Sequence, residues 1–289
     1  MTNKEKAILE HIDKIEQFAK KPENEWLLAE LERRFGGKQT QNDAIQRVEK
    51  YLGLDYKLDS VKSLIDYSYV KDNCVRNQLV SDNREMLRYR YGVRSHKIDF
   101  DEFCRYAHLQ AEALINYYYK SICVDFATLK GRIMQYNSNA KINDDYPEVE
   151  SIVYGYKIYA IIAELFPPTN NNYLFSVKGK KICSSLSNVK DVRNQQSHRS
   201  HRENYETLMT KFENDVKTEG LPWDESNKDF IWKEINESEK YENLYKTIYK
   251  NRYKEYNYYK WYLQQPFDEI IEALKILSER IKDQLFIKV

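Results

Sequence analysis

Apolar residues recur at intervals of three and four along most of the chain, which is the spacing of one face of an α-helix. In the first part of the chain, three such runs stop at Pro22, at Gly36 and at Gly53, and proline and glycine commonly end helices. A longer run follows and ends near Gly92. This pattern predicts a helical N-terminal module over residues 1–96, whose sequence suggests no chemistry.

Further helical patterns follow, and together they are enough for a four-helix bundle. The first begins at Asp99, whose carboxylate can accept hydrogen bonds from the first turn of a helix. The others cover about 147–165 and about 178–199, and the last runs from Pro266 onward. We expect Pro147 to occupy the first turn of its helix, where a missing N–H costs nothing.

Between the third and fourth of these patterns lies a segment, about 203–262, that is too helical to be a linker. Tyrosines recur in it at a spacing of four: Tyr241, Tyr245, Tyr249 and Tyr253. Five more aromatic residues follow, and lysines are interleaved with the whole run: Tyr256, Tyr258, Tyr259, Trp261 and Tyr262. Such tyrosines can stack unpaired bases of RNA, or they can form a stripe that packs on the bundle or on a second copy of the chain. We favour packing. Residues 97–289 are therefore predicted as one domain, a four-helix bundle with a helical insertion.

Composition supports this fold class and excludes several others. Only 8 glycines and 6 prolines among 289 residues favour long helices over turn-rich sheets. The 46 Lys and Arg residues against 45 Asp and Glu residues give a net charge of +1, so any basic surface must be local. No apolar run approaches the roughly 20 residues of a membrane span, and the four cysteines have no C-x-x-C spacing. We expect an all-α, cytoplasmic protein without a membrane span, a metal ion or a cofactor.

The segment NVKDVRNQQSHRSH contains the candidate chemistry. Arg193, Asn194 and His198 lie together at the end of the third bundle helix. A guanidinium can hold a phosphate through two parallel hydrogen bonds, and an imidazole can transfer protons near neutral pH. These are the groups that metal-free RNA cleavage needs, because a ribose hydroxyl must lose a proton and the leaving oxygen must gain one.

Helix geometry refines the expectation for these residues. On an ideal helix Arg193 lies only about 20° from Ile182 and extends the apolar stripe, so we expect it to be paired or to point into a seam between helices. We expect Glu112 and Asn116 to line that seam. Arg193 and His198 lie roughly 140° apart, which favours a composite site built by two copies of the chain.

Other polar residues near the motif receive separate interpretations. Basic groups around it are expected to form a rim that attracts RNA phosphates: Lys190, Arg199, His201 and Arg202. His108, on the first bundle helix, is interpreted as a structural histidine rather than a catalytic one.

The spacing R-N-x-x-x-H at the end of the third of four bundle helices resembles the HEPN superfamily. The resemblance covers roughly 97–289, with 203–262 as an insertion, and it places the family's motif residues on Arg193, Asn194 and His198. It implies a metal-independent ribonuclease that acts as a dimer with both motifs in one cleft. One subgroup carries a tyrosine two residues after the histidine, where this chain has Ser200, which puts regulation by tyrosine modification at that site in doubt.

The expected function is that of a metal-independent endoribonuclease in a bacterial defence or toxin system. The resemblance implies attack of the ribose 2′-hydroxyl, with His198 in proton transfer, Arg193 on the scissile phosphate and Asn194 orienting them. Expected partners are an RNA substrate, a second copy of the chain, and an antitoxin, guide RNA or other regulator. The alternative is a non-catalytic RNA-binding or scaffold protein, or the neutralising partner in a toxin module.

Overall fold

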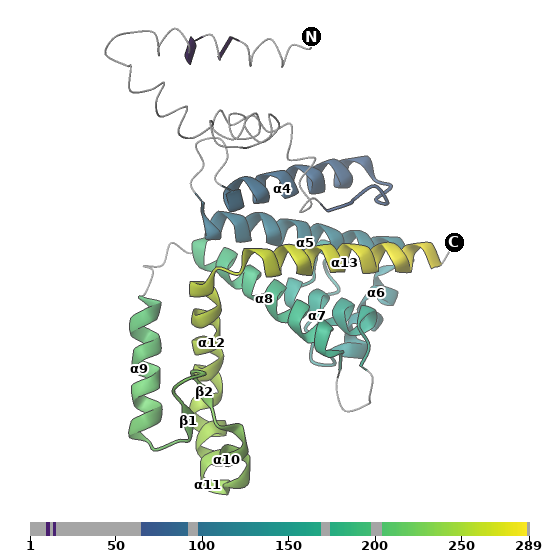
Figure 1. Ribbon diagram of the computed structural model, residues 1–289. Coiled ribbons are helices and arrows are strands. Elements are labelled where there is room, and N and C mark those ends of the chain that lie inside the picture. Colours follow the sequence, from purple (N-terminus) through teal and green to yellow (C-terminus); the bar gives the residue numbers. More distant parts are fainter. Residues whose placement is uncertain are drawn as a thin grey trace, which may run out of the picture. The chain divides into compact units, whose positions relative to one another are not determined.

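The computed structural model describes residues 10–11, 14–15, 65–91, 98–168, 174–197 and 204–287. These residues are helical apart from one short hairpin and the connecting loops, which confirms the all-α class (Figure 1). Internal contacts divide the chain into two compact units, Met1–Asp59 with Val93–Ser95, and Ser60–Gly92 with His96–Val289. Nearly all described residues belong to the second unit. The first three predicted N-terminal helices lie almost entirely outside them, so those helices stay a prediction.

Helix α5 is the centre of the bundle. It spans Phe100–Ile122 and contacts α4 (Asn73–Tyr91), α7 (Tyr154–Leu165), α8 (Val177–Ser197) and α13 (Phe267–Ile287). As predicted, Asp99 caps α5 by accepting hydrogen bonds from the backbone N–H groups of Asp101 and Glu102. The apolar stripe of α5 is buried against these neighbours: Phe103, Cys104, Ala107, Ala111, Leu114, Ile115 and Tyr118. Packing of this stripe, rather than helix propensity alone, stabilises the bundle.

Two features of the bundle differ from the sequence predictions. Helix α4 packs along α5, although its residues were predicted to belong to the N-terminal module. The prediction that Pro147 begins a helix was wrong, because the chain there forms the 3-10 turn η3 (Val149–Ser151) and α7 begins only at Tyr154. Burial of Val149 and Ile152 holds this turn against the bundle. A further helix, α6 (Phe126–Tyr136), packs on α7.

We call residues 204–264 the arm. It consists of α9 (Tyr205–Thr218), the antiparallel strands β1 (Trp223–Asp224) and β2 (Asp229–Phe230), and the helices α10 (Trp232–Glu237), α11 (Glu239–Leu244), the π-helical η4 (Tyr245–Tyr249) and α12 (Lys250–Gln264). The insertion is therefore mostly helical, as predicted, but it also contains a hairpin. The turn of that hairpin is closed by Asp224, whose carboxylate accepts hydrogen bonds from the backbone of Ser226 and Asn227.

The arm has a hydrophobic core of its own. Its buried members come from α9, the loop after α9, the hairpin, α10, η4 and α12: Phe212, Val216, Leu221, Phe230, Ile235, Tyr249 and Tyr256. Tyr256 stacks on Phe212 with ring centroids 4.7 Å apart, and its hydroxyl donates a hydrogen bond to Glu213. Tyr249 and Tyr256 thus pack inside the arm, whereas the rings of Trp261 and Tyr262 at its end contact Phe100 of the bundle.

Candidate functional site

Helix α8 carries Arg193 and Asn194 in its last two turns. The Arg193 guanidinium Nη1 donates a hydrogen bond of 3.2 Å to the Asn194 Oδ1, and Lys190 lies one turn earlier beside Asp191. The remaining candidate residues, His198, Arg199, His201 and Arg202, lie outside the described residues. The described portion of the motif therefore consists of two cations and one amide close together on one helix end.

Arg193 is exposed, although helix geometry predicted that it would extend the apolar stripe. The stripe itself is buried as predicted at Ile182, Leu186 and Val189. A long guanidinium side chain can lie over such a stripe and still carry its charged end into water. Of the two expected arrangements, a paired guanidinium or one pointing into a seam, the structure shows pairing, with Asn194 as a partner.

His108 is the nearest titratable group on α5. Its side chain is 4% exposed and lies edge-on against the ring of Tyr154 on α7, with ring centroids 4.6 Å apart. Its Nε2 atom lies 3.8 Å from the Oε2 atom of Glu112, which is partly exposed. Within the described part of the chain, neither His108 Nδ1 nor the Tyr154 hydroxyl has a hydrogen-bond partner. His108 is thus buried, as expected of a structural histidine, but its hydrogen bonding is incomplete.

Lys157 of α7 lies beside the polar residues of α5 and bonds to one of them, Asn116. Its side chain is fully buried, and its Nζ donates hydrogen bonds to Asn116 Oδ1 at 2.7 Å and to the carbonyl oxygen of Val149 at 3.0 Å. Asn116 was expected to line a seam facing Arg193, but the cation that it binds in the structure is Lys157. Sequence reasoning did not single out Lys157, although a lysine between the apolar residues of 154–165 was a usable signal.

The electrostatics of His108 connect α5 with the end of α8. Burial, and then the positive charges of Arg193, Lys190 and Lys157, together lower the pKa of His108 from 6.5 to about 4. The imidazole is therefore neutral at neutral pH. Three cations from two helices thus act on one uncharged side chain.

The His108 pKa predicts a stability change with pH. The unfolded chain binds a proton below pH 6.5 but the folded chain only below about 4, so between these values protonation favours unfolding. We expect this one residue to remove roughly 3 kcal/mol of folding free energy across that window. Urea unfolding of the wild-type chain and of His108→Gln, from neutral pH down to about 4, measures it.

The effect of His108 is the difference in the free energy of unfolding between the wild-type chain and His108→Gln at each pH, because other titrating groups contribute equally to both. Loss of stability with falling pH should be shallower in His108→Gln. An identical pH dependence in both proteins would show that His108 is not held neutral by its surroundings.

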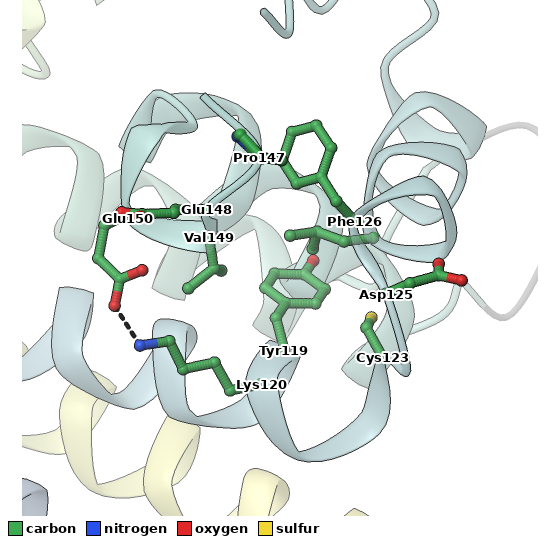
Figure 2. A pocket seen from close by; sticks show the side chains of 10 residues that line it. Tyr119, Lys120, Cys123, Asp125, Phe126, Pro147, Glu148, Val149 and Glu150 are labelled. Atoms are coloured by element: carbon green, nitrogen blue, oxygen red, sulfur yellow. Dashed lines mark ion pairs between the residues drawn. The ribbon is translucent and has the colours of Figure 1, made fainter. Parts of the chain in front are cut away.

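A separate pocket of about 530 Å³ lies between the C-terminal end of α5, the start of α6 and η3 (Figure 2). Tyr119 and Val149 contribute apolar surface, and an ion pair between Lys120 and Glu150 crosses its edge. Of the described motif residues, neither Arg193 nor Asn194 lines it. Within the described ranges, no group of three His, Cys, Asp or Glu residues is arranged to hold a metal ion. In the same ranges no helix has the length and apolarity needed to cross a membrane.

Comparison with known proteins found no matching family model, no matching curated protein and no matching solved structure.

Proposed function

We propose that the chain is a metal-independent endoribonuclease with a site at the end of α8, as its resemblance to the HEPN superfamily implies. The observation that carries this proposal is the exposed Arg193 guanidinium, bonded to Asn194 and accompanied by Lys190 on the same helix end. A paired guanidinium and amide with a neighbouring ammonium group suit a phosphodiester, because each can donate hydrogen bonds to its oxygens.

In the proposed reaction the ribose 2′-hydroxyl attacks the adjacent phosphorus. The hydroxyl proton passes to a base, the bond to the 5′-oxygen breaks, and that oxygen receives a proton, which leaves a 2′,3′-cyclic phosphate and a 5′-hydroxyl end. His198 serves in this proton transfer. Arg193 stabilises the additional negative charge on the phosphate oxygens, and Asn194 orients the guanidinium through their hydrogen bond.

The proposal includes an arrangement of two copies that brings both motifs to one cleft, because on an ideal helix Arg193 and His198 would lie roughly 140° apart. It also places the chain in the cytoplasm, in a bacterial defence or toxin system with an antitoxin, guide RNA or other regulator as partner.

Cleavage of total cellular RNA and purified tRNA in the presence of EDTA tests the proposal, with His198→Ala as the matched variant. We expect the wild-type chain to cut without metal and the variant to lose about 100- to 10,000-fold in rate, since general acid–base catalysis contributes that much. Product ends should be a cyclic phosphate and a 5′-hydroxyl.

Equal cleavage by both proteins would show that the activity lies elsewhere. If neither protein cuts, expression in cells supplies any trigger that the purified assay lacks. Growth inhibition that disappears with His198→Ala then supports a gated nuclease, whereas its absence favours the non-catalytic RNA-binding protein.

A further inference from the structure

The pocket in Figure 2 is built by three segments of the bundle. These are the end of α5 (residues 119–123), the start of α6 (residues 125–129) and the segment that leads into η3 (residues 147–150). We call it the α5–α6 pocket. Its volume of about 530 Å³ falls within the roughly 300–1,000 Å³ of cavities that hold small molecules.

Hydrogen bonds fix the walls of the α5–α6 pocket before any ligand enters. Asp125 caps α6 by accepting a hydrogen bond of 2.8 Å from a backbone N–H group in its first turn. On the η3 side, the Lys157 Nζ donates to the carbonyl oxygen of Val149. The Ser151 hydroxyl donates to the carbonyl oxygen of Glu148 at 2.7 Å. A ligand therefore meets a preformed pocket and does not have to order a loop in order to bind.

The inner surface of the pocket is apolar and partly aromatic. Tyr119, Leu129 and Val149 form it, and because they are themselves buried, the bundle holds them in place. Closer to solvent lie the half-buried ring of Phe126 and the exposed Pro147. Such a surface suits the apolar body of a ligand, because contact removes hydrocarbon surface of both partners from water.

The charged groups of the pocket are predominantly acidic. Among the described residues that line it, the carboxylates are those of Asp125, Glu148 and Glu150, and the one ammonium group is that of Lys120. Lys120 forms an ion pair with Glu150, and Asp125 faces the N–H groups at the start of α6, so these two carboxylates are compensated. The exposed Glu148 has no ion-pair partner in the described part of the chain. An uncompensated negative charge therefore lies at the mouth of an apolar pocket.

We propose that the α5–α6 pocket binds a small organic cation, in which an ammonium group is attached to an apolar body. The body packs against Tyr119, Phe126 and Leu129, and the ammonium group stays at the mouth beside the Glu148 carboxylate. Opposite charges attract there without the large desolvation cost of a deeply buried ion pair. Glu148 repels an anion, and an uncharged molecule gains only the apolar contact.

The sign of the ligand charge is tested with three probes that share an indole ring and a two-carbon chain. They are tryptamine, which is a cation at neutral pH, the alcohol tryptophol, and the anion indole-3-propionate. Isothermal titration of the full-length chain measures their affinities. We expect tryptamine to bind about 2- to 5-fold more tightly than tryptophol, which corresponds to one solvent-exposed ion pair, and indole-3-propionate to bind least tightly.

Two variants separate the contribution of charge from that of apolar contact. Glu148→Gln should abolish the preference for tryptamine and leave the affinity for tryptophol unchanged, because only the charge is lost. Phe126→Ala should weaken the binding of all three probes, because each packs its ring against the same surface. Glu255→Gln, at an exposed glutamate of α12, is the matched control and should bind the probes like the wild-type chain.

Alkylation of cysteines in the wild-type chain locates the ligand without any variant. Cys123 lines the pocket and is half-buried, whereas Cys74 on α4 is exposed and does not line it. Saturating tryptamine should slow the reaction of Cys123 with N-ethylmaleimide, measured by mass spectrometry of peptides, and leave the reaction of Cys74 unchanged.

The outcomes decide the inference separately from the proposed nuclease, because neither Arg193 nor Asn194 lines the pocket. Protection of Cys123, together with a preference for tryptamine that depends on Glu148, would support the inference. Equal affinity for the three probes, tightest binding of the anion, or an unchanged alkylation rate of Cys123 would overturn it. Absence of binding by all three probes at millimolar concentration would overturn it as well, whether or not the chain cuts RNA.

Discussion

Replacement of Arg193 by alanine is expected to lower the rate of RNA cleavage by about 100- to 1,000-fold, the usual cost of removing one donor that stabilises developing charge. The guanidinium is exposed at the end of α8 and is held by the Asn194 amide, so its loss removes the positive charge from the proposed phosphate position. Single-turnover cleavage of a short RNA in EDTA measures this effect on the chemical step.

Two controls separate chemistry from folding in this prediction. Arg193→Lys should recover only part of the rate, because an ammonium group carries the charge but not the two parallel donors of a guanidinium. Because Arg193 is exposed, the thermal unfolding temperature of Arg193→Ala should stay close to that of the wild-type chain. A variant that cuts RNA at the wild-type rate would remove Arg193 from the mechanism.

Replacement of Phe103 by alanine is expected to reduce the free energy of unfolding by about 3–5 kcal/mol. Phe103 is completely buried on α5, and its ring meets that of Phe267 at the start of α13 with centroids 4.8 Å apart. Removing the ring leaves a cavity between the two helices and also takes one neighbour from Phe100, which contacts the ring of Trp261 on α12. Chemical denaturation monitored by circular dichroism measures the loss.

The matched control is Phe286→Ala, because Phe286 near the end of α13 is 60% exposed. Its substitution should change the free energy of unfolding by no more than about 0.5 kcal/mol. Phe103→Leu should cost less than Phe103→Ala, since leucine refills most of the space. Equal stability losses at the two phenylalanines would contradict the assigned position of Phe103 in the bundle core.

Much of the candidate site was accessible to sequence reasoning because its signals are local. The Arg193–Asn194 pair was recognised from spacing alone. Glu112 and Asn116 of α5 were predicted to lie on one face, because they are one turn apart on one helix. His108 was assigned a structural role, and Lys157 was missed. The surroundings of His108 and Lys157 depend on which residues of other helices face them. The periodicity of a single helix does not contain that information.

The sequence by itself determined the all-α class and the extents of α5, α8 and α13 to within a few residues. It could do so because apolar periodicity, helix caps and helix-stopping residues act over one or two turns. Only the tertiary structure decided that α4 packs on α5 and that the arm tyrosines pack on Phe212. It also decided that His108, Lys157 and Arg193 belong to one electrostatic neighbourhood. These arrangements depend on how helices distant in sequence are rotated against one another, which is set by the burial of their combined surfaces.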